Sequence, residues 1–336
     1  MRIITNSELP SAMQDVHPTH ISVAYVGIDW RTYIDEKNLK EIIISPTIGS
    51  NPVAITQLVV LLGWSNVHFL DALHAKFYIG ESKAAVGSFN LSKNGISVNG
   101  LEELGVITED PIHIDRLNSE FSRLRSMAIN QYPNPEDKEG RLKALRTMRN
   151  QAIAEGILSD ENPLVQIEDY MPLANVDIWI MWWRNVEVER NYKVLAAADI
   201  NLREESFGGI VSNWTTALES DNIEPGSWLL MWLARGNGMP NLNAKPYWFY
   251  VHEAIPNAVE DESYTKMLLQ RKDKNIPTVP FDLDRKEVAA ALKSKLSTDE
   301  FSAFRENDGA PWSTQSCALN TKRLIAAIQS ACRKDA

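Results

Sequence analysis

Four side chains of different chemistry lie at spacings of two residues between positions 74 and 90. His74 and Lys76 come first, and Ser88 and Asn90 follow directly after Gly87. Side chains two residues apart on a β-strand point to the same face. The pattern therefore predicts that an imidazole, an ammonium group, a hydroxyl and an amide converge on one point.

This set of groups suits the cleavage of a phosphodiester. Lys76 supplies positive charge and Asn90 an amide donor for the non-bridging oxygens. A neutral His74 can attack phosphorus and form a covalent phosphohistidine, which divides one difficult step into two easier ones. The sequence offers no convincing carboxylate cluster for a metal ion, so we expect neither a metal nor another cofactor.

The arrangement resembles the phospholipase D superfamily, most closely the branch with one HxK motif per chain, which includes metal-independent nucleases and a type of restriction endonuclease. The resemblance covers residues 20–130. Its motif residues are His74, Lys76, Gly87, Ser88 and Asn90, then Asn99 and Glu103 ahead of an apolar strand. The roles that it implies are the nucleophile for His74, phosphate binding for Lys76 and Asn90, support of that network for Ser88, and orientation of the histidine for Glu103.

Two carboxylates near this motif need comment. Glu102 adjoins Glu103, and strand alternation favours Glu103 as the one that points inward, although either could be a plain surface carboxylate. Glu81 stands where the fuller family motif has an aspartate. We take that departure as weak evidence against lipid-cleaving members and as neutral for nucleases.

The number of HxK motifs bears on the oligomeric state. An in-line displacement needs a nucleophile on one side of phosphorus and an acid for the leaving oxygen on the other, and one His74 cannot do both in the first step. The other histidines, none of them in an HxK, are His17, His20, His68, His113 and His252. Family members with one motif pair two chains, so the resemblance implies a homodimer formed through the N-terminal domain, with one active site on its two-fold axis.

Residues 20–130 alternate apolar strands with helical patterns, which predicts an α/β fold with a mixed sheet flanked by helices. Pro52 in a first turn and Gly63 after Leu62 mark one helix. The expected strands lie at 20–29, 39–46, 66–80, 84–90 and 103–108, and the expected helices at 51–62, 115–130 and 139–158.

The second half differs in composition, because eight of the ten tryptophans follow residue 175. Short apolar runs predict strands at 176–183, 192–199, 227–234 and 246–254, in a compact β-rich unit that could be a barrel. Helical patterns at 284–296, 298–306 and 321–334 form a tail. We therefore expect a phospholipase D-like catalytic domain at 1–135, a helical connector at 136–170, and a β-rich, Trp-rich recognition or regulatory domain at 171–336.

Three groups of side chains in these regions have both a functional and a structural interpretation. Trp179, Trp182, Trp228 and Trp248 could stack bases, but core packing is favoured. Four loop arginines could contact phosphates, but it is more common for such residues to be scattered surface arginines without a function in binding. They are Arg184, Arg190, Arg203 and Arg235. The basic residues of the connector have two interpretations that the sequence does not separate: they contact a DNA backbone, or they form the solvated face of a helix. These residues are Arg141, Lys143, Arg146 and Arg149.

Composition sets the remaining limits. The net charge is −10, of which residues 1–150 carry only −2, so long-range steering does not favour nucleic acid. No apolar run is long enough to cross a bilayer, and the N-terminus lacks a secretory signal, so we expect a cytoplasmic protein without a membrane partner.

Together these features predict a metal-independent phosphodiesterase, most consistent with a DNA endonuclease of restriction or defence type. Two alternatives stay open. The first is a hydrolase of phospholipids or small phosphodiesters. The second is a catalytically silent dimeric binding protein, against which intact His74, Lys76 and Asn90 argue.

Overall fold

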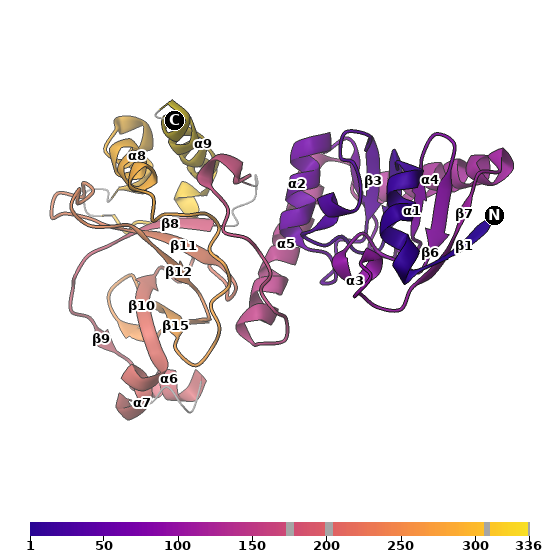
Figure 1. Cartoon of the computed structure of the whole chain (residues 1–336). Coiled ribbons are helices and arrows are strands. Elements are labelled where there is room, and N and C mark those ends of the chain that lie inside the picture. The colour runs from indigo at the N-terminus through magenta and orange to yellow at the C-terminus, as the bar shows by residue number, and fades with distance from the viewer. Residues whose placement is uncertain (173–177, 199–203, 306–309, 335–336) are drawn as a thin grey trace. The chain divides into compact units, whose positions relative to one another are not determined.

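The computed structural model describes residues 1–172, 178–198, 204–305 and 310–334. The chain forms two compact units, Met1–Leu145 and Arg146–Ala336, whose elements can be followed in Figure 1. The predicted connector at 136–170 spans the division between them. Among the described residues, no helix combines the length and the apolar character that crossing a membrane requires.

Unit 1 is built on a seven-stranded mixed sheet with the order β1-β7-β6-β5-β2-β3-β4. Its strands are β1 (Arg2–Thr5), β2 (His20–Val23), β3 (Glu41–Ile44), β4 (Val67–Phe69), β5 (Phe77–Ile79), β6 (Ala84–Gly87) and β7 (Leu104–Thr108). β2, β3 and β4 run parallel, whereas β5, β6, β7 and β1 continue the sheet with antiparallel pairs. This confirms the mixed α/β fold that the sequence predicts.

The helices of unit 1 cover both faces of this sheet, which explains why every residue of β3 is buried. They are α1 (Leu9–Val16), α2 (Pro52–Leu62), α3 (Lys93–Ile96) and α4 (Pro111–Gln131), and α5 (Pro135–Ala154) follows. The predicted bounds of α2 are confirmed, because the Asn51 side chain accepts hydrogen bonds from Val53 and Ala54 and Gly63 ends the helix at a φ of 75°. α4 packs Phe121 and Leu124 into an apolar cluster beneath β5.

The single strand predicted at 66–80 is wrong, because the structure has two strands there. β4 lies at the edge of the sheet, and the chain turns after Leu70 before it enters the middle of the sheet as β5, beside β2. A continuous strand cannot make that crossing, since β4 and β5 are not neighbours. His74 and Lys76 consequently lie in the extended segment just before β5.

Unit 2 holds three small sheets, with the orders β10-β15-β13, β12-β11-β8 and β14-β9. The strands are β8 (Ile178–Trp183), β9 (Glu189–Arg190), β10 (Val211–Ala217), β11 (Trp228–Leu233), β12 (Tyr247–Tyr250), β13 (Glu253–Ile255), β14 (Val259–Glu260) and β15 (Lys266–Arg271). The helices are α6 (Tyr192–Ala198), α7 (Glu204–Ile210), α8 (Lys286–Leu296) and α9 (Ala318–Lys334). In the described part of the chain these sheets do not join into one closed barrel.

Two features of unit 2 differ from the sequence expectation. The strand predicted at 192–199 is wrong, because residues of high helix propensity form α6 there, and Asn191 accepts a hydrogen bond from the amide of Val194 at its start. β10 and β15, which pair with each other, were not predicted. Polar residues in both strands interrupt the run of apolar residues from which a strand is predicted.

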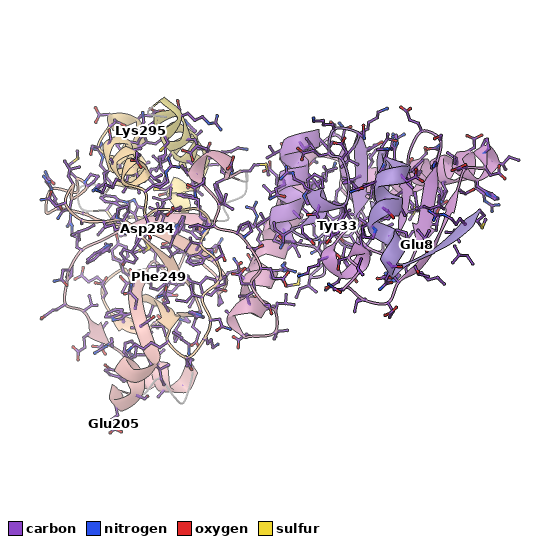
Figure 2. All side chains as sticks on the ribbon, in the orientation of Figure 1. Glu8, Tyr33, Glu205, Phe249, Asp284 and Lys295 are labelled. Carbon is purple, nitrogen blue, oxygen red and sulfur yellow. The ribbon has the colours of Figure 1, made fainter. Side chains whose placement is uncertain are left out.

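The tryptophans of unit 2 mainly fill its core, as favoured above. Trp179 and Trp228 are 6% and 4% exposed, and they lie in one apolar cluster with Phe249, which is labelled in Figure 2. Trp182 and Trp248 are partly buried against the same cluster. For Trp179 and Trp228, stacking on bases would require the core to open.

Candidate active site

The five predicted site residues come from three segments at one end of the unit 1 sheet. Lys76 pairs directly opposite Gly87, since its carbonyl accepts a hydrogen bond from the Gly87 amide at 3.2 Å. The Ser88 amide in turn donates to the Leu104 carbonyl at 3.0 Å. The start of β5, the end of β6 and the start of β7 therefore meet, because antiparallel neighbours place these ends together.

His74 and Lys76 contact each other directly. The Lys76 Nζ lies 3.3 Å from His74 Nε2 and donates to the His74 carbonyl at 2.8 Å. An ammonium group can only donate, so this contact assigns the lone pair of the imidazole to Nε2 and its proton to Nδ1. His74 is exposed, whereas Lys76 is only 7% exposed. A solvent-accessible imidazole therefore contacts a largely buried cation.

The burial of Lys76 sets its electrostatic behaviour. Burial lowers the pKa of its ammonium group, and the negative charge of Glu103 works in the opposite direction. A cation removed from water interacts more strongly with an incoming anion than one on the surface does. The site thus places a largely buried positive charge beside the imidazole.

Ser88 and Glu103 form a second contact. The Ser88 hydroxyl donates to Glu103 Oε2 and accepts a hydrogen bond from the Leu104 amide at 3.1 Å. The structure therefore places Glu103 against Ser88, and within the described residues no hydrogen bond joins it to His74. This differs from the orienting role that the resemblance implies. The neighbouring Glu102 is exposed.

The loop that carries Glu103 is held by Asn6, from the turn η1 (Asn6–Glu8). Its side-chain oxygen accepts from the Glu103 amide at 2.6 Å, and its side-chain nitrogen donates to the Leu101 carbonyl at 2.5 Å. Asn6 was not predicted as a site residue. It lies almost a hundred residues from Glu103 in sequence, and a single asparagine in a turn gives no local signal.

The orientation of Asn90 follows from one backbone contact. Its Oδ1 accepts a hydrogen bond from the Tyr25 amide at 2.9 Å, just beyond the end of β2. The acceptor end of the amide is therefore occupied, which leaves the donor end, Nδ2, to bind an oxygen of a ligand. A donor end left for a ligand is what the role predicted for Asn90 requires, and that role stays a prediction.

Phe89, between Ser88 and Asn90, forms the floor of the site. Its buried ring stacks on Tyr78 at 5.4 Å and lies against Gly87 and Gly105. A Cβ at Gly87 would lie 2.2 Å from Phe89 Cε1, and one at Gly105 would lie 2.4 Å from the same atom. These glycines make room for the ring. The sequence did not single out Phe89 or Gly105.

Two of the arginines considered for phosphate contacts, Arg190 and Arg141, contact other side chains of the protein. The Arg190 guanidinium lies over the rings of Phe207, Tyr192 and Trp214, at 4.6, 5.2 and 5.8 Å from their centres. Arg141 of the connector pairs with Asp71 at 3.2 Å. Arg203 lies outside the described residues. A search of the described part of the chain finds no group of three His, Cys, Asp or Glu residues placed to hold a metal ion.

Comparison with known proteins gives structural matches only. Neither a family model nor a curated protein matches this sequence. NucT from Helicobacter pylori is 18% identical over 38% of this chain and 95% of its own, with a TM-score of 0.30. Nuc from Salmonella typhimurium, a phospholipase D family member, is 15% identical over 38% and 93%, with a TM-score of 0.31. The archaeal chromatin protein TrmBL2 is 13% identical over 38% and 53%, with a TM-score of 0.26.

Proposed function

We propose that this protein is a metal-independent phosphodiesterase that acts as a DNA endonuclease of restriction or defence type. The observation that carries the proposal is the contact between His74 Nε2 and Lys76 Nζ at 3.3 Å. An unprotonated imidazole nitrogen and a largely buried cation are adjacent there, and the Tyr25 amide occupies Oδ1 of Asn90, which leaves Nδ2 as the donor for a ligand. Such a constellation binds the anionic oxygens of a phosphodiester beside a nucleophile.

The reaction takes two displacements. His74 Nε2 attacks phosphorus, a P–N bond forms, and the P–O bond to the leaving strand breaks. Lys76 and Asn90 stabilise the charge on the non-bridging oxygens, while an acid on the far side gives a proton to the leaving oxygen. Water then attacks phosphorus, gives its proton to that same group, and releases His74 as the P–N bond breaks.

We assign the acid on the far side to His74 of a second copy, which makes the enzyme a homodimer. A rim of exposed apolar side chains beside Glu103 supports this assignment. Leu104 is 59% exposed, Leu101 63% and Ile3 67%, and β1 places Ile3 next to the strand that carries Leu104. A second copy on this rim would cover these side chains and bring its own His74 to the site.

The test incubates supercoiled plasmid with the full chain in EDTA. We compare wild type, His74→Gln and the matched control His113→Gln, which changes a surface histidine of α4. Wild type and His113→Gln should cut, and His74→Gln should not. A protein–DNA adduct that withstands alkali and decays in acid should form only when His74 is present. Cutting by His74→Gln at the wild-type rate would contradict the proposal.

The dimer has its own test. Leu104→Lys should shift the sedimentation of the chain from dimer to monomer and abolish cutting, because each copy then lacks the second histidine. The control is Leu242→Lys, which changes an exposed leucine of unit 2. A wild-type chain that is monomeric and still cuts would remove the dimer from the proposal.

The apolar rim also favours one other substrate. An exposed apolar rim beside a phosphodiester site suits a lipid interface as well as a protein interface. Release of headgroups from phospholipid vesicles, in the absence of plasmid cutting, would replace DNA with lipid as the substrate. It would leave the roles of His74 and Lys76 unchanged.

A further inference from the structure

Unit 2 contains a cavity of about 250 Å³ that the proposed reaction does not use. Its lining comes from the end of α5, from the turn before β11 and from the end of β12. The lining residues are Gln151, Ala154, Glu155, Pro225, Gly226, Tyr250 and His252. Ala154 and Pro225 supply apolar walls, and the polar side chains come from Gln151, Glu155, Tyr250 and His252.

Tyr250 is the unusual member of this lining. It is 1% exposed, and its hydroxyl has no hydrogen-bond partner among the described residues. Burial raises the pKa of this phenol, and the charge of Glu155 raises it further, so the group stays a neutral O–H donor. A buried hydroxyl without a partner destabilises a fold, and its presence beside a cavity indicates a ligand that supplies the missing acceptor.

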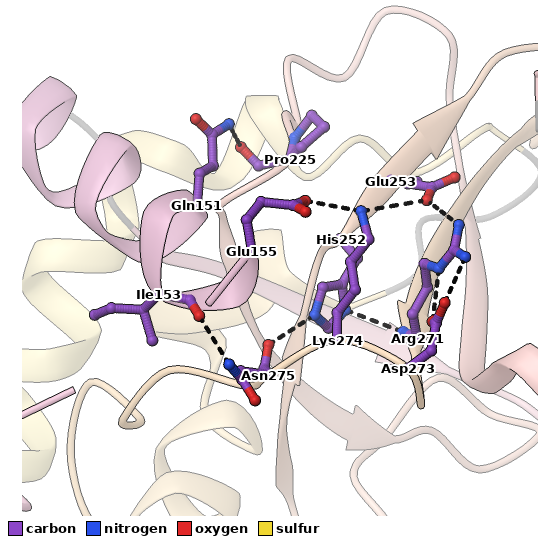
Figure 3. A network of polar contacts seen from close by, with 10 residues as sticks. All are labelled: Gln151, Ile153, Glu155, Pro225, His252, Glu253, Arg271, Asp273, Lys274 and Asn275. Atoms are coloured by element: carbon purple, nitrogen blue, oxygen red, sulfur yellow. Dashed lines mark hydrogen bonds and ion pairs between the residues drawn. The ribbon is translucent and has the colours of Figure 1, made fainter. Parts of the chain in front are cut away.

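Glu155 gives the cavity a negative group. One oxygen, Oε1, pairs with Lys274 Nζ at 2.8 Å, and the carboxylate is half exposed. Figure 3 shows Lys274 beside Glu155. The other oxygen, Oε2, has no partner in the part of unit 2 that the structure describes, so it can accept from a ligand. A carboxylate at this position disfavours an anion and favours N–H donors.

His252 forms a fixed wall rather than a third binding group. Its Nδ1 accepts from the Arg271 amide at 3.0 Å, and its Nε2 lies 2.9 Å from the Asn275 carbonyl, so both ring nitrogens are occupied (Figure 3). The ring meets that of Tyr250 edge-on, with centres 4.8 Å apart. Of His252, therefore, only the apolar surface of the ring remains to contact a ligand, whereas Tyr250 still offers its hydroxyl.

We propose that this cavity binds a nucleobase with the hydrogen-bonding edge of guanine. The carbonyl oxygen of such a base accepts from Tyr250, and the adjacent N–H groups donate to Glu155. Flat apolar walls suit a planar ring. The volume equals that of about eight waters at ~30 Å³ each, which suits one base and is below the range of larger ligands. The inference stands whether or not unit 1 cuts DNA.

The experiment measures melting of the full chain with 2′-deoxyguanosine, deoxyinosine, deoxyadenosine or inorganic phosphate. Deoxyguanosine should raise the melting temperature of unit 2, and deoxyinosine, which lacks one N–H group, should bind about tenfold more weakly. Deoxyadenosine and phosphate should have no effect. A single-stranded oligonucleotide with one guanine, compared with its adenine counterpart, distinguishes a base within a strand from a free nucleoside.

Tyr250→Phe separates a binding role from a structural one. It removes only the hydroxyl, so the unliganded chain should melt at the same temperature or higher, while the shift with deoxyguanosine disappears. Glu155→Gln should weaken that shift, and the control Tyr247→Phe, in the same strand, should keep it. The absence of any shift in wild type, or an equal shift in Tyr250→Phe, would overturn the proposal.

Discussion

The two sites place their polar groups in opposite ways. In unit 1, His74 is exposed and its ring contacts a buried cation, Lys76. In unit 2, the hydroxyl of Tyr250 is buried without a partner, and the nearby charge is the carboxylate of Glu155. A nucleophile must be accessible to its substrate, whereas a group that only recognises a ligand forms its strongest hydrogen bond when it is shielded from water. In the two proposals these charges select different ligands, an anion for unit 1 and an uncharged hydrogen-bond donor for unit 2.

Removal of the cation of unit 1 should have the largest effect. Lys76→Met keeps the length of the side chain but removes the charge, so cutting should fall by about 10²–10³-fold. The rate is measured on plasmid in EDTA. The control is Lys83→Met, because Lys83 pairs with Asp15 and Glu109 away from His74. If Lys76→Met cut DNA at a rate within threefold of wild type, the positive charge of Lys76 would not contribute to catalysis, and the comparison of charges between the two sites would not explain their functions.

The orientation of Asn90 permits a sharper test of the same site. In Asn90→Asp one carboxylate oxygen can still accept from the Tyr25 amide, so the chain should fold. The other oxygen replaces the donor with a negative charge that repels phosphate, and we expect a loss of about 10²-fold. Asn118→Asp, on the exposed side of α4, should cut normally. Normal cutting by Asn90→Asp would exclude a phosphate contact through Nδ2.

Substitutions around the Phe89 ring should lower the stability of unit 1 more than they lower the cutting rate. In Gly105→Ala the new Cβ would lie 2.4 Å from the Phe89 ring and 2.8 Å from the Val86 carbonyl. We expect a loss of about 1–3 kcal/mol in the free energy of unfolding, measured with urea. Phe89→Leu should recover part of this loss in the double variant. Gly208→Ala, where the new Cβ meets nothing within 4 Å, is the control.

The candidate residues of unit 1 could be named from the sequence because they lie close together in it. The HxK spacing and the Gly-Ser-x-Asn turn point to His74, Lys76 and Asn90, and their catalytic roles stay predictions. Asn6 could not be found, because its contact with Glu103 depends on how β1 joins β7. The sheet order likewise decides that 66–80 breaks into two strands.

The unit 2 cavity carries no such signal. Its lining combines positions 151–155, 225–226 and 250–252, and the end of α5 meets the turn before β11 only in the folded chain, where Gln151 donates to the Pro225 carbonyl. The helix at 192–198 was missed for a related reason, because a short stretch that is mostly apolar fits a strand or a helix and tertiary context decides between them. Short-range pattern therefore predicts reactive motifs better than it predicts cavities.

A smaller effect concerns the acid stability of unit 2. Burial lowers the pKa of His252, because the charged imidazolium loses its hydration, while the hydrogen bond to the Asn275 carbonyl works in the opposite direction. Below pH 6.5 the unfolded chain therefore binds a proton that the folded chain refuses, so the free energy of unfolding falls as the pH drops from 6.5 toward the folded pKa. Tryptophan fluorescence reports this unit, since eight of the ten tryptophans follow residue 175. His252→Gln should flatten the dependence between pH 7 and pH 5, and an unchanged slope would mean that another group carries it.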